Sequence, residues 1–455
     1  MVQKMKLAYI GGGSTAWAWK LMSDLACDET ISGEVLLYDI DMEAAKRNEK
    51  IGNLSGKGRF VYKAVPTLPE ALKGADFVII SILPGGLDCM ESDVHYPEKY
   101  GIYQSVGDTT GPGGIVRAIR TIPMYVEFAQ AIEKYAPNAW VINYTNPMSM
   151  CTDTLYRVFP KIKAFGCCHE VFGTQRLLAS MLKEVKGLEN VQRNEIKVNV
   201  KGINHFTWID SAFYKDIDLL PLYEQFAVKH YEGIDNNDFD EDDSCRMYSF
   251  KHRIKFDLFL RYHKIAAAGD RHLAEFCPGQ WYLDNPDVVK QWGFGLTTVP
   301  ARREEYQERY ENAMAVINGT REFHPEESGE EGVHQMKALM GMGDLVTNVN
   351  LPNQGQVSDL PLGRIVETNA HFTSGKITPV IAGELGGVPH AMTIRVSDNF
   401  DQVVTSCLKD DLSGCLSAFQ NDQLVTRISH GQAEEMFMAM LKNTEAYLGS
   451  YKKIW

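Results

Sequence analysis

Two short segments carry side chains that could bind a metal ion and transfer protons. Residues 166–173 read GCCHEVFG, which places a histidine and a glutamate directly after Cys168. A second imidazole, His205, follows in the segment GINHF. A thiolate and an imidazole can hold a borderline divalent cation and leave coordination positions open for substrate oxygens. The spacing alone fits equally well a small buried cysteine and a hydrogen-bonded strand histidine, so both interpretations stay open at this point.

A glycine-rich loop near the N-terminus indicates a dinucleotide site. The sequence GGGSTA at 11–16 follows an apolar strand pattern, opens a helical pattern and satisfies G-x-G-x-x-G/A with Ala16 in the last position. Glycines here permit the tight turn and the approach of backbone to a pyrophosphate, while the helix N-terminus faces the anion. The residues expected at the cofactor are Gly11, Gly12, Gly13 and Ser14.

An acidic residue at the end of the second predicted strand favours NAD over NADP. Asp39 stands at the distance from the glycine loop expected for a carboxylate that hydrogen-bonds the ribose hydroxyls and repels a 2′-phosphate. Two further loops, SILPGG at 81–86 and NYTNP at 143–147, follow predicted strands. Open α/β sheets bind ligands at the carboxyl ends of their strands, so these loops are either cofactor-lining or ordinary strand-end turns. The further cofactor contacts expected from them are Pro84, Gly85 and Asn143.

A third glycine-rich segment, 105–121, leads into a helix that carries Arg117 and Arg120. Glycines and arginines suit an anionic ligand, because arginine makes charge-assisted hydrogen bonds. Arg120 is equally compatible with a structural position near a helix end.

The elements that must position these residues alternate between strand and helix through the first third of the chain. Such patterns succeed one another at 6–10, 15–26, 34–41, 42–54, 75–83, 120–136 and 139–145. Continuous apolar strands between helices predict a parallel sheet covered on both faces. We therefore expect an α/β fold in which a Rossmann-type doubly wound, NAD-binding domain, 1–195, precedes a mixed α+β domain, 196–455, for substrate binding, metal binding and oligomerisation. A hairpin pattern at 195–214 marks the boundary.

Charge and cysteine usage disfavour several classes of partner. With 59 acidic against 46 basic residues the formal net charge is −13, which argues against nucleic acids and anionic membranes. Nine cysteines without a framework spacing point to a reducing, cytoplasmic location and against disulfides. The most apolar strand-like run, 77–83, is far shorter than the ~20 residues that cross a bilayer. The segment 231–244 is acidic and predicts a solvated loop, and the Met-rich segments 336–343 and 434–443 suit either the interface helices of a homo-oligomer or core packing.

The order of these motifs resembles that of the NAD- and manganese-dependent family 4 glycoside hydrolases. The shared segments are GGGS, SILPGG, GDTTGPGG, INYTNPM, CCHEVFG and GINHFTW, with thinner similarity through AAGDRHLAEF at 267–276 and LVTNVNLPNQGQVSDLP at 345–361. The early fold and the Asn-Pro after a strand are also shared with lactate and malate dehydrogenases, whose GxHGD-like loop we do not find. In the glycosidase family the four residues that begin with the ligand cysteine follow substrate class. Cys168-His169-Glu170-Val171 looks like the variant of the α-galacturonidases.

The resemblance implies an exception to the two-carboxylate scheme of glycoside hydrolysis. NAD-assisted oxidation of C3 makes the C2 proton acidic, the aglycone leaves by elimination, water adds, and the ketone is reduced again. A cation, Mn²⁺ or another divalent ion, would be held by Cys168 and His205 and act as a Lewis acid. The substrate would be a small uronide such as an oligogalacturonide. Alternatives are an α-glucuronidase or α-glucosidase of the same family, a net NAD-dependent uronate or polyol dehydrogenase, and a non-catalytic NAD-responsive regulator.

The resemblance also suggests roles for individual residues. His169 stands where relatives often carry an aspartate that protonates the leaving group, and Asp270 resembles the Gly-Asp base that removes the C2 proton, although some relatives use a tyrosine. Asn146 matches the substrate-binding asparagine of the TNP loop. The remaining substrate contacts implied are Glu170 and, for the C6 carboxylate, Arg271 or His272, for which surface ion pairing is the alternative.

Overall fold

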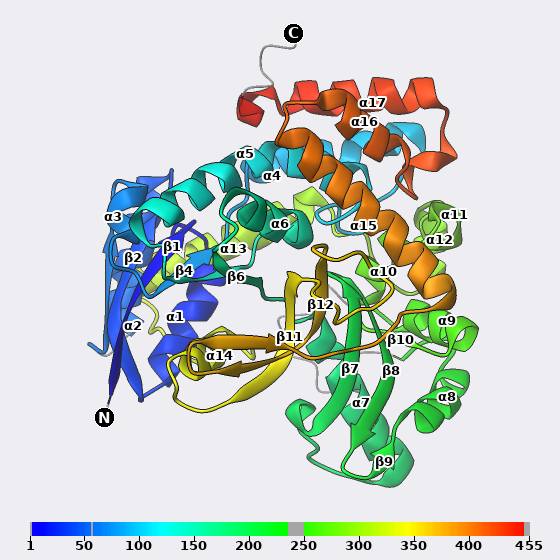
Figure 1. The fold of residues 1–455 in the computed structure, drawn as a ribbon, viewed down its shortest axis with the longest axis horizontal. Helices are drawn as coiled ribbons and strands as arrows, with labels where there is room; N and C mark the ends of the chain where they lie inside the picture. Colours follow the sequence, from blue (N-terminus) through cyan, green and yellow to red (C-terminus); the bar gives the residue numbers. More distant parts are fainter. Residues whose placement is uncertain (1, 56–57, 235–249, 450–455) are drawn as a thin grey trace.

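The computed structural model describes residues 2–55, 58–234 and 250–449. Its largest element is a nine-stranded sheet in the order β13-β12-β11-β6-β5-β4-β1-β2-β3 (Figure 1). The six strands from the N-terminal part pair in parallel, in the strand order of a doubly wound dinucleotide-binding fold. They are β1 (Gln3–Ile10), β2 (Ile31–Tyr38), β3 (Phe60–Ala64), β4 (Phe77–Ile80), β5 (Trp140–Asn143) and β6 (Lys163–Gly166). The predicted fold class is confirmed.

Helices cover both faces of this parallel sheet, which explains why its strands are short apolar runs rather than alternating patterns. All four residues of β4 are buried. The covering helices from this part of the chain are α1 (Trp17–Cys27), α2 (Met42–Ser55), α3 (Leu68–Leu72), α5 (Gly111–Tyr135) and α6 (Met148–Val158). Helix α4 (Gly86–His95) packs against α5 instead. Helix α5 begins at Gly111, nine residues before the start predicted from periodicity, because the glycine-rich segment itself forms the first turns.

Three strands from the C-terminal half continue the same sheet. β11 (Leu345–Pro352) pairs antiparallel with β6 and with β12 (Ile365–Thr373), and β13 (Lys376–Pro379) forms the outer edge. The register places Asn350 opposite both Gly166 and Glu367. The sheet therefore crosses the predicted boundary near residue 195, and backbone hydrogen bonds join the two regions.

A second, smaller sheet, β10-β8-β7, contains the hairpin predicted at 195–214. β7 (Ile196–Ile203) and β8 (Phe206–Tyr214) pair antiparallel, so that Asn204 and His205 form the turn between them. β9 (Ile217–Asp218) and β10 (Ile265–Ala266) also pair with β8. Helices α7 (Glu170–Lys186), α8 (Leu220–Lys229), α9 (Arg253–Tyr262) and α10 (Asp270–Phe276) pack around this sheet.

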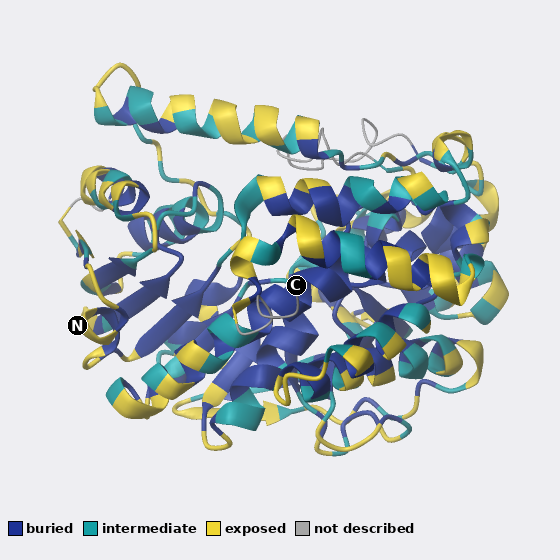
Figure 2. Cartoon of the chain, turned by 90° about the horizontal axis from the view of Figure 1, so that it is seen from above, coloured by how far each residue is buried: buried dark blue, intermediate teal, exposed yellow. Residues whose placement is uncertain are grey.

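The remaining helices form the outer layers. α15 (Gly387–Cys407), α16 (Leu412–Gln420) and α17 (His430–Asn443) lie over α5 at the end of the molecule where the chain ends (Figure 1). The others are α11 (Gly279–Tyr282), α12 (Pro286–Gln291), α13 (Val299–Ile317) and α14 (Gly332–Leu339). Strands are buried at the centre and exposed residues follow the outer helix faces (Figure 2). Met336, Met436 and Met440 of the Met-rich segments lie in the core of this chain.

Three further expectations concern the acidic segment, membrane-spanning helices and the cysteines. Most of the acidic segment 231–244 lies outside the described residues. Within the described ranges, no helix is both long enough and apolar enough to span a bilayer. The eight described cysteines are free, as expected from their spacing.

Candidate active site

The glycine loop lies at the carboxyl edge of the parallel sheet, between β1 and α1. The backbone N–H groups of Gly11 and Gly12 both donate to the carbonyl of Tyr38 at 2.9 Å, which folds the loop over the end of β2. Gly11 has φ of +89°, and a Cβ there would lie 1.9 Å from the carbonyl oxygen of Ser81, so only glycine fits. The hydroxyl of Ser14 accepts a hydrogen bond from the N–H of Trp17 at 3.2 Å, which begins α1.

Asp39 follows β2 directly and is tied to the glycine loop. Its Oδ2 accepts from the N–H of Gly13 at 2.8 Å, and its Oδ1 accepts from the N–H of Asp41 at 2.9 Å. Next to it Ile40 is 87% exposed, an apolar side chain that an adenine ring could cover. Loop, carboxylate and apolar surface together are compatible with a dinucleotide bound through its adenosine half.

The other two crevice loops are held by buried polar contacts. Pro84 lies in the loop after β4, and its carbonyl accepts from Nε of Arg120 at 3.0 Å. The guanidinium of Arg120 also pairs with Asp93, and both side chains are completely buried. Arg120 is therefore structural, which was one of its two predicted roles. Gly85 caps the N-terminus of α4 with φ of +78°, and a Cβ there would collide with Cys89.

Asn143 is buried at the end of β5 and uses its side chain within the protein. Its Oδ1 accepts from the hydroxyl of Tyr125 at 2.5 Å and from the N–H of Thr145 at 3.0 Å. Its Nδ2 donates to the carbonyl of Thr145 and to the hydroxyl of Thr152. Asn143 thus shapes the loop that presents Asn146, and its contact with a cofactor stays a prediction.

Three side chains from distant segments meet in a group suited to a divalent cation. Ligand atoms of Asp108, His205 and His272 all lie within 4.8 Å of one another. The rings of the two histidines are 3.8 Å apart between centroids. Asn146 joins the group, because its Nδ2 donates to Asp108 at 3.3 Å. Two buried atoms of this group, Nδ1 of His272 and Oδ1 of Asn146, have no protein partner among the described residues.

Hydrogen bonding sets the tautomer of His205. Thr109 donates its only hydroxyl proton to Asp108 at 2.7 Å. In the 2.9 Å contact between Thr109 and His205, the ring N–H at Nδ1 of His205 therefore donates to the hydroxyl oxygen. Nε2 of His205 is left with its lone pair, the form that coordinates a metal. His205 occupies the hairpin turn with φ of +62°, a conformation that is uncommon for a non-glycine residue.

Burial and neighbouring charges give this group the ionisation state of a ligand set. Burial lowers the pKa of His205, and burial together with His205 lowers the pKa of His272 to about 3. Burial alone would raise the pKa of Asp108, but Arg117, His272, His205 and Arg302 together outweigh it and hold that pKa well below its ordinary value. Two neutral imidazoles and one carboxylate are donors that borderline divalent cations accept. The residues present therefore fit a metal ion.

Cys168 lies just after β6, buried beside this group but outside it. Its carbonyl accepts from Nδ2 of Asn348 at 3.2 Å, and its thiol contacts the side chain of Asn204, the neighbour of His205. Burial raises the pKa of the thiol well above its ordinary value, and Glu367 and Glu170 add to the effect. A nearby cation would reverse this, because a coordinating thiol is deprotonated. The predicted ligand pair of Cys168 and His205 stays a prediction.

His169 is half-exposed and faces a glutamate that no sequence motif indicates. Its Nδ1 lies 3.2 Å from Oε1 of Glu330, which Lys20 also approaches at 3.2 Å. The ring of Trp17 lies 5.9 Å from the imidazole and 5.1 Å from the ring of Tyr144. Burial alone would lower the pKa of His169, but Glu330 and Glu170 outweigh it and raise that pKa. The imidazolium form needed for a general acid is thereby favoured.

Glu170 links the CCHE loop to the start of α10. Its Oε2 accepts from the N–H of Gly269 at 2.7 Å, and its Oε1 lies 3.6 Å from Nε2 of His272. Burial would raise the pKa of Glu170, but His272 and His169 hold it well below the ordinary value. Glu170 therefore lies beside His272 of the three-residue group.

Asp270 is fully buried and faces the first turn of α9. Its Oδ1 accepts from the N–H of Lys255 at 3.2 Å, whereas its Oδ2 has no partner in the described part of the chain. Burial raises its pKa to about 6, although Lys255 opposes the shift. No hydrogen bond among the described residues joins Asp270 to the Asp108 group. Arg271 donates to Thr297, and its carbonyl accepts from the hydroxyl of Ser105.

Another carboxyl group that sequence analysis did not indicate, Glu275, anchors the loop of Asp108. Its Oε1 accepts from the N–H groups of Val106 and Gly107 at 2.7 and 2.8 Å, and its Oε2 has no partner in the described ranges. Burial raises the pKa of Glu275 to about 8, against the effect of these two backbone donors. The group is therefore largely protonated at neutral pH.

Glu275 predicts a pH dependence of stability. Its folded pKa of about 8 exceeds that of an unfolded glutamate near ~4.3, so the stability it contributes is complete below the unfolded pKa and is lost as pH rises through about 8. We expect the free energy of unfolding of the wild type to fall by a few kcal/mol, as an order of magnitude, between about pH 5 and pH 8. Glu275→Gln, which keeps the acceptor for Val106 and Gly107, should flatten this slope in denaturant titrations. Equal slopes in the two proteins would contradict the assignment.

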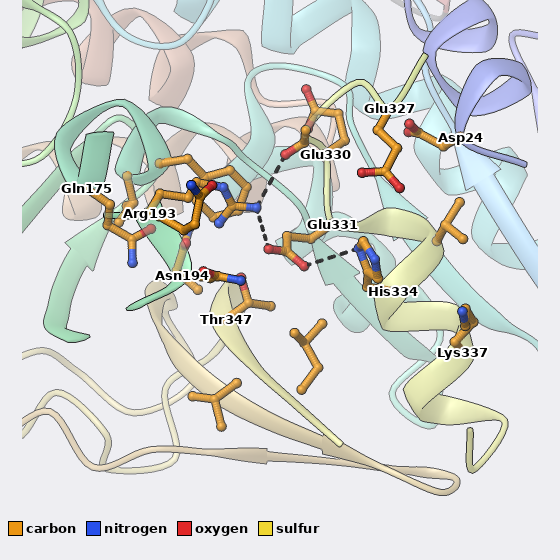
Figure 3. Close-up of a pocket in the computed structure, with 18 of the residues that line it drawn as sticks. Asp24, Gln175, Arg193, Asn194, Glu327, Glu330, Glu331, His334, Lys337 and Thr347 are labelled. Carbon is orange, nitrogen blue, oxygen red and sulfur yellow. Dashed lines mark hydrogen bonds and ion pairs between the residues drawn. The ribbon is translucent and has the colours of Figure 1, made fainter. Parts of the chain in front are cut away.

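A separate cavity of about 1100 Å³ lies behind Glu330, between α1, α7, α14 and β11. Figure 3 shows Arg193 and Glu331 pointing toward one another across it, with His334 and Lys337 on α14 beside them. Arg193 donates to Glu331 at 2.6 Å. Glu330 lines this cavity and also contacts His169, so the histidine marks the boundary between the cavity and the Cys168 loop.

Two family models match this chain. The family model described as family 4 glycosyl hydrolase matches residues 6–184, and that of the family 4 glycosyl hydrolase C-terminal domain matches residues 200–425. An α-galacturonidase of Thermoanaerobacterium saccharolyticum is 57% identical over 456 aligned residues, which cover 99% of this chain and 98% of the relative.

Solved structures resemble the whole fold. The Bacillus subtilis protein LplD is 52% identical and superposes with a TM-score of 0.93, covering 97% of this chain and 100% of its own. A 6-phospho-β-glucosidase of Thermotoga maritima, solved with manganese, NAD⁺ and glucose 6-phosphate, superposes with a TM-score of 0.79 over 97% of this chain and 99% of its own. At 22% identity the second likeness shows the fold alone.

Proposed function

Because the chain belongs to family 4 of the glycosyl hydrolases, we propose that it is an α-galacturonidase that works with NAD⁺ and a divalent cation, Mn²⁺ foremost. The family predicted from the motifs is confirmed, and with it the expectation of an enzyme. The observation that carries the substrate class is the 57% identity, over 99% of the chain, to an α-galacturonidase. The manganese and NAD⁺ of a structural neighbour support the cofactors.

In this proposal the carboxyl edge of the sheet holds the dinucleotide, and the Asp108–His205–His272 group lies at the cation beside the reacting sugar. Bound NAD⁺ would supply an oxidant for C3, and the cation would polarise the substrate oxygens O2 and O3. Gly11, Gly12, Gly13 and Ser14 would receive the pyrophosphate at the N-terminus of α1, and Asp39 the ribose. The tight packing of the loop around Gly11 supports this placement.

His205 is the proposed central cation ligand, together with Cys168. The free Nε2 of His205 and the contact of Cys168 with Asn204 support the pair. Asp108 and His272 extend the donor set, since their ligand atoms lie within 4.8 Å of that of His205. Asn146 would orient the sugar, because its amide already donates to Asp108 and its Oδ1 lacks a partner among the described residues.

Proton transfers are assigned to His169 and Asp270. His169, whose pKa Glu330 raises, would protonate the leaving oxygen. Asp270 is the proposed base at C2, and its pKa of about 6 and its unpartnered Oδ2 suit proton uptake near neutral pH. Arg271 is the proposed partner of the C6 carboxylate, since His272 is neutral and offers no positive charge. We further propose that the protein is a homo-oligomer and acts in the cytoplasm.

The Glu330–His169 contact predicts a shift in the pH profile. Glu330→Gln removes a charge that raises the pKa of His169, so the alkaline limb of kcat/KM should move to lower pH. Lys20→Gln is the matched control, because Lys20 lowers the same pKa and its removal should move the limb to higher pH. His169 would be contradicted as the acid if the alkaline limb stayed in place in both variants. It would also be contradicted if the limb moved in the same direction in both.

A substrate panel tests the function itself. The nitrophenyl α-glycosides of galacturonic acid, glucuronic acid, galactose and glucose are assayed with NAD⁺ and Mn²⁺ added or withheld. We expect hydrolysis of the galacturonide that requires both additions and leaves no net NADH. Activity that survives removal of NAD⁺ and metal would contradict the mechanism, a preference for glucuronide would correct the substrate, and NADH accumulating with turnover would indicate a dehydrogenase instead.

A further inference from the structure

The side chain of Glu367 is buried next to the proposed cation site but belongs to neither loop that carries the ligands. It lies on β12, is 1% exposed, and comes from a segment without a motif for metal or sugar binding. A carboxylate in such a position is costly unless hydrogen-bond donors surround it. The groups that donate hydrogen bonds to Glu367 therefore indicate its role.

Two asparagine amides donate to this carboxylate. Nδ2 of Asn348, on β11, lies 2.6 Å from Oε1 of Glu367, and Nδ2 of Asn204, in the turn before His205, lies 3.2 Å from Oε2. Both asparagines are buried. Each oxygen of Glu367 thus fixes the orientation of one amide, because an accepting oxygen must face the NH₂ of the amide rather than its carbonyl oxygen.

Each of these asparagines touches a proposed ligand segment. Asn348 also donates to the carbonyl of Cys168 at 3.2 Å. Asn204 contacts the thiol of Cys168 and immediately precedes His205. Glu367 therefore connects, through one asparagine each, the loop after β6 and the hairpin turn between β7 and β8. These two segments share no backbone pairing in the described sheets.

We propose that Glu367 is a positioning residue that holds Cys168 and His205 at the separation a shared cation needs. This inference rests on the proposed function, since it concerns the same cation. Groups behind metal ligands typically contribute ~10–100-fold to metal affinity, because they fix ligand orientation. A purely structural carboxylate would instead affect folding stability without a specific effect on the metal.

Glu367→Gln is the direct test. Glutamine offers one oxygen and one NH₂ group, so its NH₂ faces the NH₂ of either Asn348 or Asn204. That contact is then lost, or it is kept by a flip of the asparagine amide, which removes the asparagine's donation to Cys168. We expect the Kd for Mn²⁺, measured by electron paramagnetic resonance of the free ion, to rise about 10–100-fold. The near-ultraviolet thiolate band of the Co²⁺-loaded protein should weaken, while the Kd for NAD⁺ stays within about twofold.

Two further variants separate positioning from stability. Thr368→Val alters the next residue of β12, whose buried hydroxyl has no partner among the described residues, and should leave Mn²⁺ affinity unchanged. In the double variant Glu367→Gln with Asn348→Asp, the Gln NH₂ donates to the new carboxylate, which restores the pairing between β11 and β12. The aspartate, however, no longer donates to the carbonyl of Cys168. Its melting temperature should recover while its Mn²⁺ affinity does not.

The outcomes distinguish this inference from the proposed function. Wild-type Mn²⁺ affinity in Glu367→Gln, or affinity that recovers together with the melting temperature in the double variant, would overturn the positioning role. A wild-type protein that binds Co²⁺ without a thiolate band would instead overturn Cys168 as a ligand, and with it the proposed pair of Cys168 and His205.

Discussion

His205→Gln is expected to abolish stoichiometric Mn²⁺ binding and to lower kcat/KM on a galacturonide by about 10³-fold. His205 is common to the predicted pair with Cys168 and to the group with Asp108 and His272, so either arrangement loses a ligand. Lewis-acid stabilisation contributes several kcal/mol, and each ~1.4 kcal/mol is tenfold in rate. Metal content of the purified protein and steady-state kinetics check the result. His390→Gln, at a histidine bonded to the carbonyl of Asp359, is the control and should keep its metal.

Two more variants decide which donors hold the cation. We expect Cys168→Ser to weaken Mn²⁺ binding more than His272→Gln does, because thiolate and imidazole are the proposed pair. The reverse order would assign the cation to Asp108, His205 and His272, whose ligand atoms are already within 4.8 Å of one another. If His205→Gln retained one equivalent of Mn²⁺, both proposed ligand sets, Cys168 with His205 and Asp108 with His205 and His272, would be contradicted.

Asp93→Asn is expected to lower the free energy of unfolding by about 3–5 kcal/mol. The change leaves the guanidinium of Arg120 completely buried without a charge partner, and removing one member of a buried ion pair is strongly destabilising. Arg120 also donates to the carbonyl of Pro84, so the loop after β4 should loosen as well. Denaturant titration measures the first effect, and the Kd for NAD⁺ reports the second.

The same helix supplies the matched control. Asp88, also on α4, pairs with Arg303 at the surface, where the two side chains are 89% and 46% exposed. Exposed pairs contribute ~0–1 kcal/mol, so Asp88→Asn should change stability little. Similar losses in the two variants would mean that burial does not govern the strength of these pairs.

Features encoded by short, continuous segments were predictable. The glycine loop, Asp39 at the end of β2 and the hairpin that presents His205 each depend on neighbours within a few residues, and the structure has them as predicted. The segment 105–121 was recognised by its glycines and arginines. Its acidic member, Asp108, was not singled out, because only the fold brings it beside His205 and His272.

Features that depend on long-range contacts were not predictable. Glu330 and Glu367 lie in segments without chemical motifs, and they reach His169 and Asn204 only after the chain has folded. Similarly, no sequence pattern indicates that β11, β12 and β13 join the sheet of the N-terminal part. Periodicity reports which face of an element is buried, whereas partner choice is decided by the whole fold.

The extension of the sheet by β11 also bears on how the protein is made. β6 leaves the ribosome long before its partner, since Cys168 and Asn348 are 180 residues apart in the chain. Until β11 arrives, β6 is an open edge with unpaired backbone groups, which invites association with other chains. Late pairing of this kind slows folding. The nascent N-terminal half thus depends on the last third of translation to close its sheet and, with Asn348 in place, to complete the environment of Cys168.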